Sequence, residues 1–246
     1  MDFERHLPFD GCFNFRDLGG YATVDGRTVR PRRLYRADGP HALTDADAAI
    51  LVALGLHTVI DLRTPDEARD RGSFDAVVPD AQYHDLPLTD VLPDADELPA
   101  WVDPAVVARR YRDMLEAASG RIAEVLAILS EPGAYPAMYH CSAGKDRTGI
   151  VTAVVLGALG VADETIIADY ALSRHAMTRL LAHLHDRYPD ASERLAQVAP
   201  AMIAAEPETM ALLLEGLRRD YGSFDAYAAH VGAAGAPPRL RRALLS

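Results

Sequence analysis

The sequence predicts an α/β fold with a mostly parallel central sheet, helices on both faces of the sheet and a C-terminal helical cap. Up to about residue 160, short segments rich in β-branched and aromatic residues alternate with amphipathic segments. The segment Val59-Ile60 before Asp61 is apolar at consecutive positions, which is typical of a buried parallel strand. From residue 163 onwards the hydrophobic periodicity is helical only, and this predicts the cap.

Four segments are expected to be strands, since each is short, β-branched or aromatic, and bounded by turn residues. They span residues 33–36, 57–62, 82–86 and 137–141. A small hairpin is expected near the start of the chain, where Asp25-Gly26 separates two extended segments. Glycine tolerates the positive φ that such two-residue turns require.

The helices are predicted from their caps and from their breaks. The amphipathic pattern between Thr44 and Gly55 indicates a helix, with Thr44 at its N-cap and Gly55 at its C-terminal end. The predicted cap helices span residues 165–173, 175–188, 191–205, 207–221 and 223–231, with breaks at Pro189, Pro200 and Gly222. The acidic, proline-marked stretch 93–104 is expected to be a loop.

Length and composition favour one domain over residues 1–246, with an α/β core at 1–160 and a helical extension packed on it at 161–235. The longest apolar stretch near a candidate span covers residues 150–159, about half of what a bilayer requires. No secretory signal pattern is present. We therefore expect a cytoplasmic protein without integral membrane association, although secretion by a route without a signal stays open.

Charge and cysteine content exclude further classes of protein. A formal net charge of -11 argues against a nucleic-acid partner, since phosphate backbones are bound by clustered lysine and arginine. An anionic substrate must then be attracted locally. The two cysteines, Cys12 and Cys141, are too few for a disulfide framework, and their spacing does not suggest a zinc site.

The most informative stretch connects a predicted strand to a long apolar helix. It reads His-Cys-Ser-Ala-Gly-Lys-Asp-Arg-Thr-Gly over residues 140–149. The N-terminus of a helix presents unpaired N–H groups and the positive end of a dipole, so an anion binds there readily. If the chain between Cys141 and Arg147 forms a ring, the amides of residues 142–147 can surround a phosphoryl group with the sulfur beneath the phosphorus.

The residue types in this loop suit phosphoryl transfer. A thiolate is the nucleophilic form of cysteine, and the amides, the helix N-terminus and Arg147 would all favour ionisation of Cys141. Gly144 lets the backbone approach closely. The planar guanidinium of Arg147 can bind two phosphoryl oxygens and stabilise the charge that develops on them, while Thr148 can add a hydroxyl hydrogen bond.

The loop, in which five residues separate Cys141 from Arg147 and Thr148 follows directly, resembles the signature of the protein tyrosine phosphatase superfamily. Asn14-Phe15-Arg16-Asp17-Leu18-Gly19-Gly20 and Asp61-Leu62-Arg63 add a resemblance to the atypical bacterial tyrosine and phosphoinositide phosphatases. The resemblance implies a phosphotyrosine-phosphatase-like fold and a two-step reaction through a phosphocysteine, without a metal ion or other cofactor. It implies phosphotyrosine proteins or phosphoinositides as substrates.

The site that the resemblance implies consists of Cys141, Arg147 and the loop residues Ser142, Ala143, Gly144, Lys145 and Asp146, with Lys145 as a cation beside the phosphoryl group. The proton donor to the leaving oxygen stays open. Many members use an aspartate beside Trp and Pro, whereas the single tryptophan here, Trp101, precedes Val102-Asp103-Pro104. Asp146 and Asp90 are the two candidates, and the acid is left open between them, although Asp146 is slightly favoured for a role in catalysis of some kind.

Other interpretations weaken the assignment little. Cys141 as a plain buried thiol would not need Gly144, Arg147 and Thr148 around it. Cys12 is expected to fill the core, with a reversible disulfide to Cys141 as the alternative. His140 is expected to orient the loop by hydrogen bonding.

Competing functions are a rhodanese-like sulfurtransferase and an inactive phosphate-binding module. A rhodanese does not need Arg147 and Thr148, and an inactive module would normally lack the cysteine or arginine.

Overall fold

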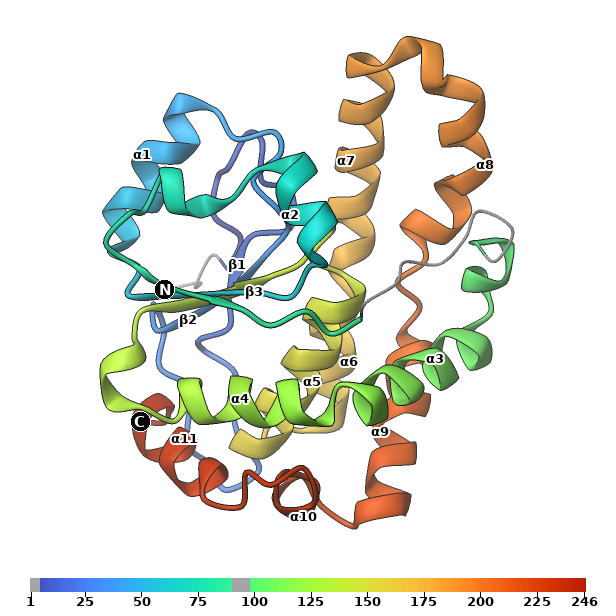
Figure 1. Ribbon diagram of the computed structural model, residues 1–246. Helices are drawn as coiled ribbons and strands as arrows, with labels where there is room; N and C mark the ends of the chain where they lie inside the picture. Colours follow the sequence, from blue (N-terminus) through green and yellow to red (C-terminus); the bar gives the residue numbers. More distant parts are fainter. Residues whose placement is uncertain (1–4, 90–97) are drawn as a thin grey trace.

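A computed structural model describes residues 5–89 and 98–246 (Figure 1). At its centre lies a five-stranded sheet with the order β1-β2-β5-β3-β4, in which β1 is antiparallel to β2 and the other pairs are parallel. The strands are β1 (Arg16–Asp17), β2 (Leu34–Ala37), β3 (Thr58–Asp61), β4 (Gln82–Asp85) and β5 (Ala137–His140). The four predicted strands are confirmed.

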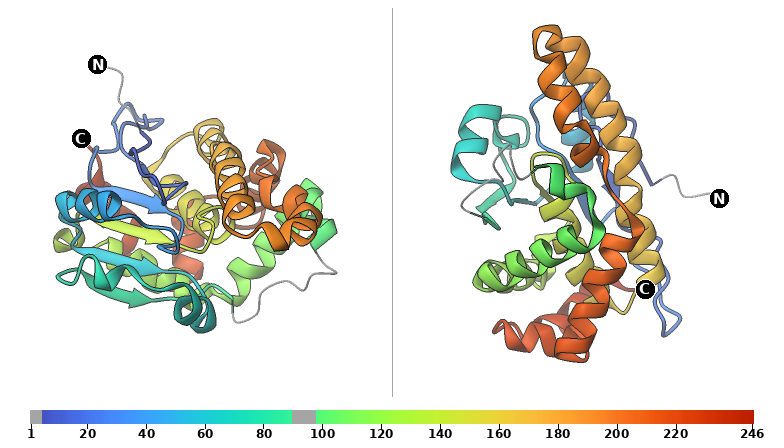
Figure 2. Two further views of the ribbon diagram at one scale, coloured as in Figure 1. Left: turned by 90° about the horizontal axis from the view of Figure 1, so that it is seen from above. Right: turned by 90° about the vertical axis from the view of Figure 1, so that its right-hand side faces the viewer.

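Helices cover both faces of the sheet. Successive side chains along a strand point to opposite faces, so neighbouring residues of one strand pack in different layers. Val59 and Met138 pack with Leu51 of helix α1 (Asp45–Leu54) in one buried cluster. Ile60 and Tyr139 belong to a larger cluster on the other face, built with helices α4 (Ser119–Leu129) and α5 (Asp146–Leu159). The layered arrangement is seen from above in Figure 2. The predicted α/β fold class is confirmed.

Local capping signals account for the first helix and the hairpin. The side chain of Thr44 accepts a hydrogen bond from the N–H of Asp47, and the carboxylate of Asp47 accepts one from the N–H of Thr44. Gly55 ends α1 with a φ of 60°. In the hairpin, Ala22 and Thr28 form an antiparallel bridge around Gly26, whose φ is 84°. Both predictions are confirmed.

The other helices of the first half lie between the strands. Helix α2 (Pro65–Arg71) follows β3, and α3 (Pro104–Ala117) precedes α4. The predicted loop 93–104 falls partly outside the described residues. Its described part contains the short 3-10 helix Leu98–Val102, after which Asp103 caps α3.

The second half is helical, as predicted. It contains α6 (Asp163–Ala171), α7 (Ser173–Arg187), α8 (Ser192–Ile203), α9 (Pro207–Tyr221), α10 (Phe224–His230) and α11 (Ala236–Leu244). Helices α7 and α8 lie side by side and extend beyond the sheet (Figures 1 and 2). Among the helices of the described segments, none combines the length and the apolar character that a membrane span requires.

Two details of the predicted cap are wrong. Pro200 does not break a helix but lies inside α8, near its end. Proline removes one hydrogen bond from a helix, and α8 continues for only three residues beyond Pro200. Lys145 also binds carbonyl groups at the end of this helix. Helix α11 lies beyond the helical extension predicted for residues 161–235, and its first turn contains the Pro237-Pro238 pair, a residue type that interrupts helices elsewhere. Proline suits the first turn of a helix, however, and Leu240 and Leu244 are buried in the main core.

Candidate active site

The site lies where the carboxyl ends of three neighbouring strands meet. Cys141 directly follows β5, the central strand, and Asp38 follows β2. Backbone hydrogen bonds continue past the strand ends, from the N–H of Leu62 to the carbonyl of His140 at 2.9 Å and from the N–H of Gly39 to the carbonyl of Ser142 at 3.1 Å. The start of the loop is therefore fixed to both adjacent strands, at the edge where open α/β sheets bind ligands.

The loop carbonyls are bound by side chains from outside the loop. The side-chain N–H of Asn14 donates to the carbonyls of Ala143 and Gly144 at 3.0 and 2.9 Å, and the guanidinium of Arg36 donates to the carbonyl of Gly144 at 2.7 Å. In a trans peptide the C=O and the following N–H point in opposite directions. The N–H groups of Gly144 and Lys145 are therefore directed away from these donors.

Gly144 makes this curvature possible in two ways. Its φ is 64°, in the left-handed region that residues with a Cβ rarely adopt. A Cβ at this position would also lie 2.6 Å from the carbonyl oxygen of Ala37 and 2.7 Å from the backbone nitrogen of Asp38. Both atoms are backbone at the end of β2, so the loop packs too closely against this strand for any other residue.

A buried ion cluster holds the donors in place. The Asp169 carboxylate of α6 binds Arg16 at 3.0 Å and Arg36 at 2.6 Å, and all three side chains are fully buried. Burial alone would raise the pKa of Asp169, but the two guanidinium charges outweigh it and hold this pKa well below its usual range. Arg16 also donates to the side-chain oxygen of Asn14 at 2.5 Å. The Asn-Phe-Arg-Asp block thus supports the loop from beneath.

Asp38 fixes the same segment from its other side. Its buried carboxylate accepts hydrogen bonds from the N–H groups of Phe13 and Asn14 at 2.9 Å. The thiol of Cys12 donates to it at 2.9 Å, and burial next to this carboxylate raises the pKa of Cys12 well above its usual value. Cys12 and Cys141 are both free thiols. Cys12 is therefore a hydrogen-bonded core residue here.

Arg147, in the first turn of α5, is held by a carboxylate that the sequence reasoning missed. Its two terminal nitrogens donate to the two oxygens of Glu67 at 2.6 and 2.8 Å. Burial disfavours the charged guanidinium, but the hydrogen bonds to Glu67 and the electrostatic interactions with Cys141 and Glu67 outweigh this effect and raise the pKa of Arg147. Cys141 itself is 2% exposed. The cation is therefore permanently charged and fixed in orientation beside the sulfur.

Glu67 contacts both the start of its own helix and the catalytic loop. On α2 it completes a capping box with Thr64, and it also accepts a hydrogen bond from the hydroxyl of Ser142 at 2.5 Å. Burial would raise the pKa of Glu67, but Arg147, Ser142 and the Thr64 amide outweigh it and lower this pKa to about 2. The Thr64-Pro65-Asp66-Glu67 capping signal after a strand end could have drawn attention to this residue.

The comparison with known proteins agrees with this geometry. A model described as "Tyrosine phosphatase family" matches residues 7–246. The chain belongs to the tyrosine phosphatase family. A protein of Cupriavidus necator, named among the tyrosine-protein phosphatases, is 34% identical over 91% of this chain and 83% of its own length. The triple specificity protein phosphatase PtpB of Mycobacterium tuberculosis is 28% identical over 98% of both chains. The sequence resemblance is confirmed.

Of the two candidate proton donors in this tyrosine phosphatase, the structure describes one. Asp146 begins α5, and its side chain is 26% exposed. Its Oδ1 accepts a hydrogen bond from the hydroxyl of Tyr111 on α3 and lies 3.6 Å from the Nζ atom of Lys145. Asp90 lies outside the described residues.

The Lys145 side chain extends from the loop to the end of α8. Its ammonium donates to the carbonyls of Ala201, Met202 and Ala204 at 2.8, 3.2 and 2.9 Å, at the C-terminal end of α8. This is the negative end of a helix dipole, where a cation is favoured. The sequence placed Lys145 beside the phosphoryl group, whereas here it ties the phosphatase loop to α8.

His140 and Thr148 complete the surroundings of the sulfur. Burial lowers the pKa of His140 to about 4, even though Asp61 lies 3.7 Å away, so the ring is neutral at pH 7. Its Nδ1 atom lies 3.3 Å from the carbonyl of Cys141, and its ring packs edge-on against Phe74. The buried hydroxyl of Thr148 has no hydrogen-bond partner within the part of the chain that the structure describes.

Proposed function

We propose that this phosphatase hydrolyses phosphomonoesters through a phosphocysteine on Cys141, with Arg147 binding the transferring phosphoryl group. The observation that carries the proposal is the combination of a buried cysteine at a strand end with an arginine in the first turn of the following helix, fixed through both terminal nitrogens by Glu67. Helix N-terminus, amides and guanidinium all favour an anion at this point.

The first chemical step is displacement at phosphorus. The Cys141 thiolate attacks in line, an S–P bond forms, and the P–O bond to the alcohol or phenol breaks with its electron pair leaving on oxygen. Asp146, in its protonated form, gives its proton to that oxygen. We prefer Asp146 as this acid because it lies inside the loop at the start of α5 and is partly exposed, so that a bound ester can reach it.

The second step regenerates the enzyme. A water molecule attacks the phosphorus of the phosphocysteine while the Asp146 carboxylate accepts a proton from it. The S–P bond breaks, its electron pair returns to sulfur, and inorganic phosphate leaves. The same residue serves as acid and then as base, so each turnover restores its protonation state.

Arg147 is expected to act mainly in the transition state. Glu67 occupies one side of each terminal nitrogen, which leaves the Nε–H and the remaining N–H groups of Arg147 for phosphoryl oxygens. A guanidinium held in one plane can bind two oxygens at once, which lysine cannot do.

Aryl phosphates such as phosphotyrosine are the leading substrate class, with phosphoinositides and phosphoserine next. A small apolar cluster supports the preference for a phenyl ring, because Ala143 of the loop packs against it. Its buried members are Phe13, Ala176, Met177 and Leu180. The term "triple specificity" in the name of the mycobacterial relative supports a test of all three classes.

The test is turnover of para-nitrophenyl phosphate by the purified protein, with and without a chelator. We expect activity in both conditions, and we expect Cys141→Ser to abolish turnover while phosphate binding, followed by calorimetry, is retained. Acid quenching with ³²P-labelled substrate should trap label on the wild type and none on Cys141→Ser. Phosphopeptides and phosphoinositides then rank the substrate classes. Sulfur transfer from thiosulfate without phosphatase activity would reject the proposal in favour of a sulfurtransferase.

A further inference from the structure

Two buried tyrosine hydroxyls lie behind Asp146. Tyr111 of α3 is fully buried and donates a hydrogen bond to Oδ1 of Asp146. The hydroxyl of Tyr170 of α6, which is 1% exposed, lies 2.9 Å from that of Tyr111. Their rings meet edge-on, with centroids 6.3 Å apart. Three elements far apart in the sequence thus converge on one carboxyl group at the edge of the loop.

The direction of these hydrogen bonds follows from counting protons. A hydroxyl has one hydrogen, and Tyr111 gives its hydrogen to Asp146. Tyr170 must therefore be the donor in the bond between the two tyrosines. Burial raises the pKa of both hydroxyls, so both keep their protons at neutral pH. The result is an ordered chain from Tyr170 through Tyr111 to Oδ1.

We propose that Tyr111, supported by Tyr170, is a positioning residue that holds Asp146 by Oδ1 and thereby presents Oδ2 as the oxygen that carries the transferable proton. This inference rests on the proposed role of Asp146 as acid. Within the described residues Oδ2 of Asp146 has no hydrogen-bond partner, and the side chain is partly exposed. The held oxygen and the delivering oxygen are thus distinguished by their contacts.

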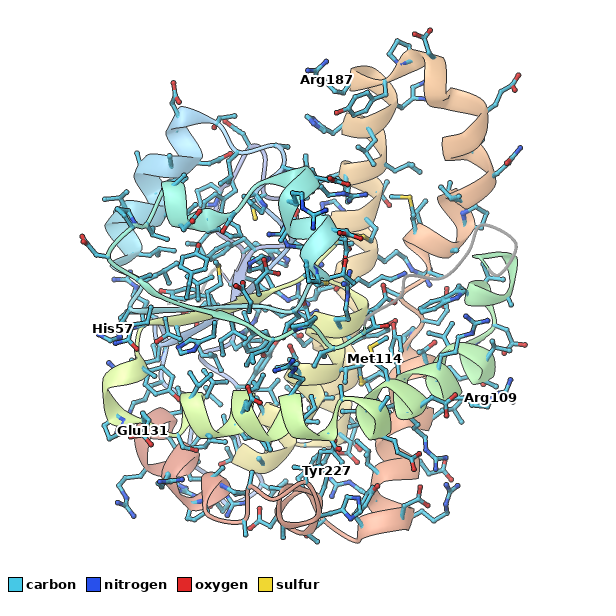
Figure 3. All side chains as sticks on the ribbon, viewed as in Figure 1. His57, Arg109, Met114, Glu131, Arg187 and Tyr227 are labelled. Carbon is cyan, nitrogen blue, oxygen red and sulfur yellow. The ribbon has the colours of Figure 1, made fainter. Side chains whose placement is uncertain are left out.

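A purely structural role explains the tyrosine pair less well. Tyr111 packs in the core of the helical side, where phenylalanine would fill the same space, yet its hydroxyl is directed to the single carboxylate of the catalytic loop. Tyr227 of α10, labelled in Figure 3, in contrast has a buried hydroxyl without a hydrogen-bond partner within the described chain. Of these two buried tyrosines, Tyr111 alone donates a hydrogen bond to the catalytic loop.

The test compares Tyr111→Phe with wild type on two esters, para-nitrophenyl phosphate and phenyl phosphate. Phenolate is the poorer leaving group and depends more on proton donation. We expect kcat on phenyl phosphate to fall about tenfold, the scale of one lost hydrogen bond to a charged group, with less change on the nitrophenyl ester and in KM. Tyr170→Phe keeps the direct bond between Tyr111 and Asp146. Its kcat on phenyl phosphate should therefore fall by only about two- to threefold, again with less change on the nitrophenyl ester.

Controls separate positioning from loss of stability. Tyr139→Phe removes another buried hydroxyl, which lies 2.9 Å from the hydroxyl of Thr152 and makes no hydrogen bond to Asp146 within the described residues. This variant should keep the wild-type ratio of the two kcat values. The double variant Tyr111→Phe with Asp146→Asn should lose no more than Asp146→Asn alone, since both act through one group.

The outcomes are distinguishable. If Asp146→Asn does not selectively slow phenyl phosphate, the proposed acid is wrong and the inference is rejected with it. If Asp146→Asn is selective but Tyr111→Phe slows both esters equally, or adds fully to Asp146→Asn, the acid stands and the positioning role is rejected. Should Tyr111→Phe not fold, the ratio of the two kcat values of Tyr170→Phe decides in its place: a selective loss on phenyl phosphate supports positioning, and an unchanged ratio rejects it.

Discussion

Replacing Gly144 with alanine should damage both stability and activity, and the structure allows the two causes to be separated. The added Cβ would meet three backbone atoms of Ala37 and Asp38 at 2.6–2.7 Å. A left-handed conformation costs a residue with a Cβ about 1–2 kcal/mol, and overpacking typically adds about 1–3 kcal/mol. We therefore expect Gly144→Ala to lower the free energy of unfolding by about 2–5 kcal/mol.

Gly55 is a matched control for this substitution. Its φ of 60° is close to the 64° of Gly144, but a Cβ on Gly55 would have no heavy atom within 4 Å. Gly55→Ala should therefore incur only the conformational cost, about 1–2 kcal/mol. The difference between the two variants in urea denaturation isolates the steric contact with the end of β2.

Activity should separate the two glycines more strongly. Because the clash can be relieved only by moving the loop or the strand end, and a shift of about 1 Å at a reacting centre can cost on the order of 100-fold, we expect kcat/KM of Gly144→Ala to fall at least about 100-fold. Gly55→Ala should retain wild-type kcat/KM. Equal unfolding free energies for the two variants, or a fully active Gly144→Ala protein, would refute the close-approach argument.

Two further predictions concern the charged residues around the loop. The pKa of Glu67 lies near 2 in the folded protein, below its ordinary 4.5, so its contribution of about 3 kcal/mol is present above pH 4.5 and is lost as the pH falls towards 2. In Glu67→Gln, the free energy of unfolding, measured by denaturation at a series of pH values, should decrease less as the pH is lowered than it does in the wild type. We also expect kcat/KM to fall about tenfold. A pH dependence of stability equal to that of the wild type would contradict the ion pair with Arg147. Lys145→Met should speed proteolysis within α7–α8 under limited trypsin, and a digestion rate equal to wild type would contradict the tie to α8.

Local signals in the sequence predict the elements that depend on local interactions. Helix α1 begins and ends where Thr44 and Gly55 indicate, since a capping box and a left-handed glycine act within one turn of chain. The exceptions have tertiary causes. Pro200 stays helical in a helix whose end is bound by Lys145, and α11 forms because Leu240 becomes buried beside the core. Neither contact can be read from neighbouring residues.

The same distinction applies to the site. Cys141, Gly144 and Arg147 lie within one loop, so their spacing alone indicates what they surround. Glu67 is 80 residues away from Arg147, and Tyr111 is 35 residues away from Asp146. The capping signal around Glu67 indicates the start of a helix but not the partner Arg147, and an isolated tyrosine carries no signal of its partner. The residues that reasoning from sequence misses are those that orient the reacting groups from other elements.

The ion pair of Arg147 with Glu67 also bears on how an acidic chain binds an anionic ester. The net charge of -11 repels phosphate at a distance. Of the two loop cations, Lys145 binds the end of α8, and the charge of Arg147 is largely neutralised by Glu67. Attraction in the ground state must then come largely from amides and the helix N-terminus, which act at short range. The guanidinium contributes chiefly a fixed set of donors. Since such donors are most effective where charge develops, Glu67 shifts the use of Arg147 from binding the substrate to stabilising the transition state.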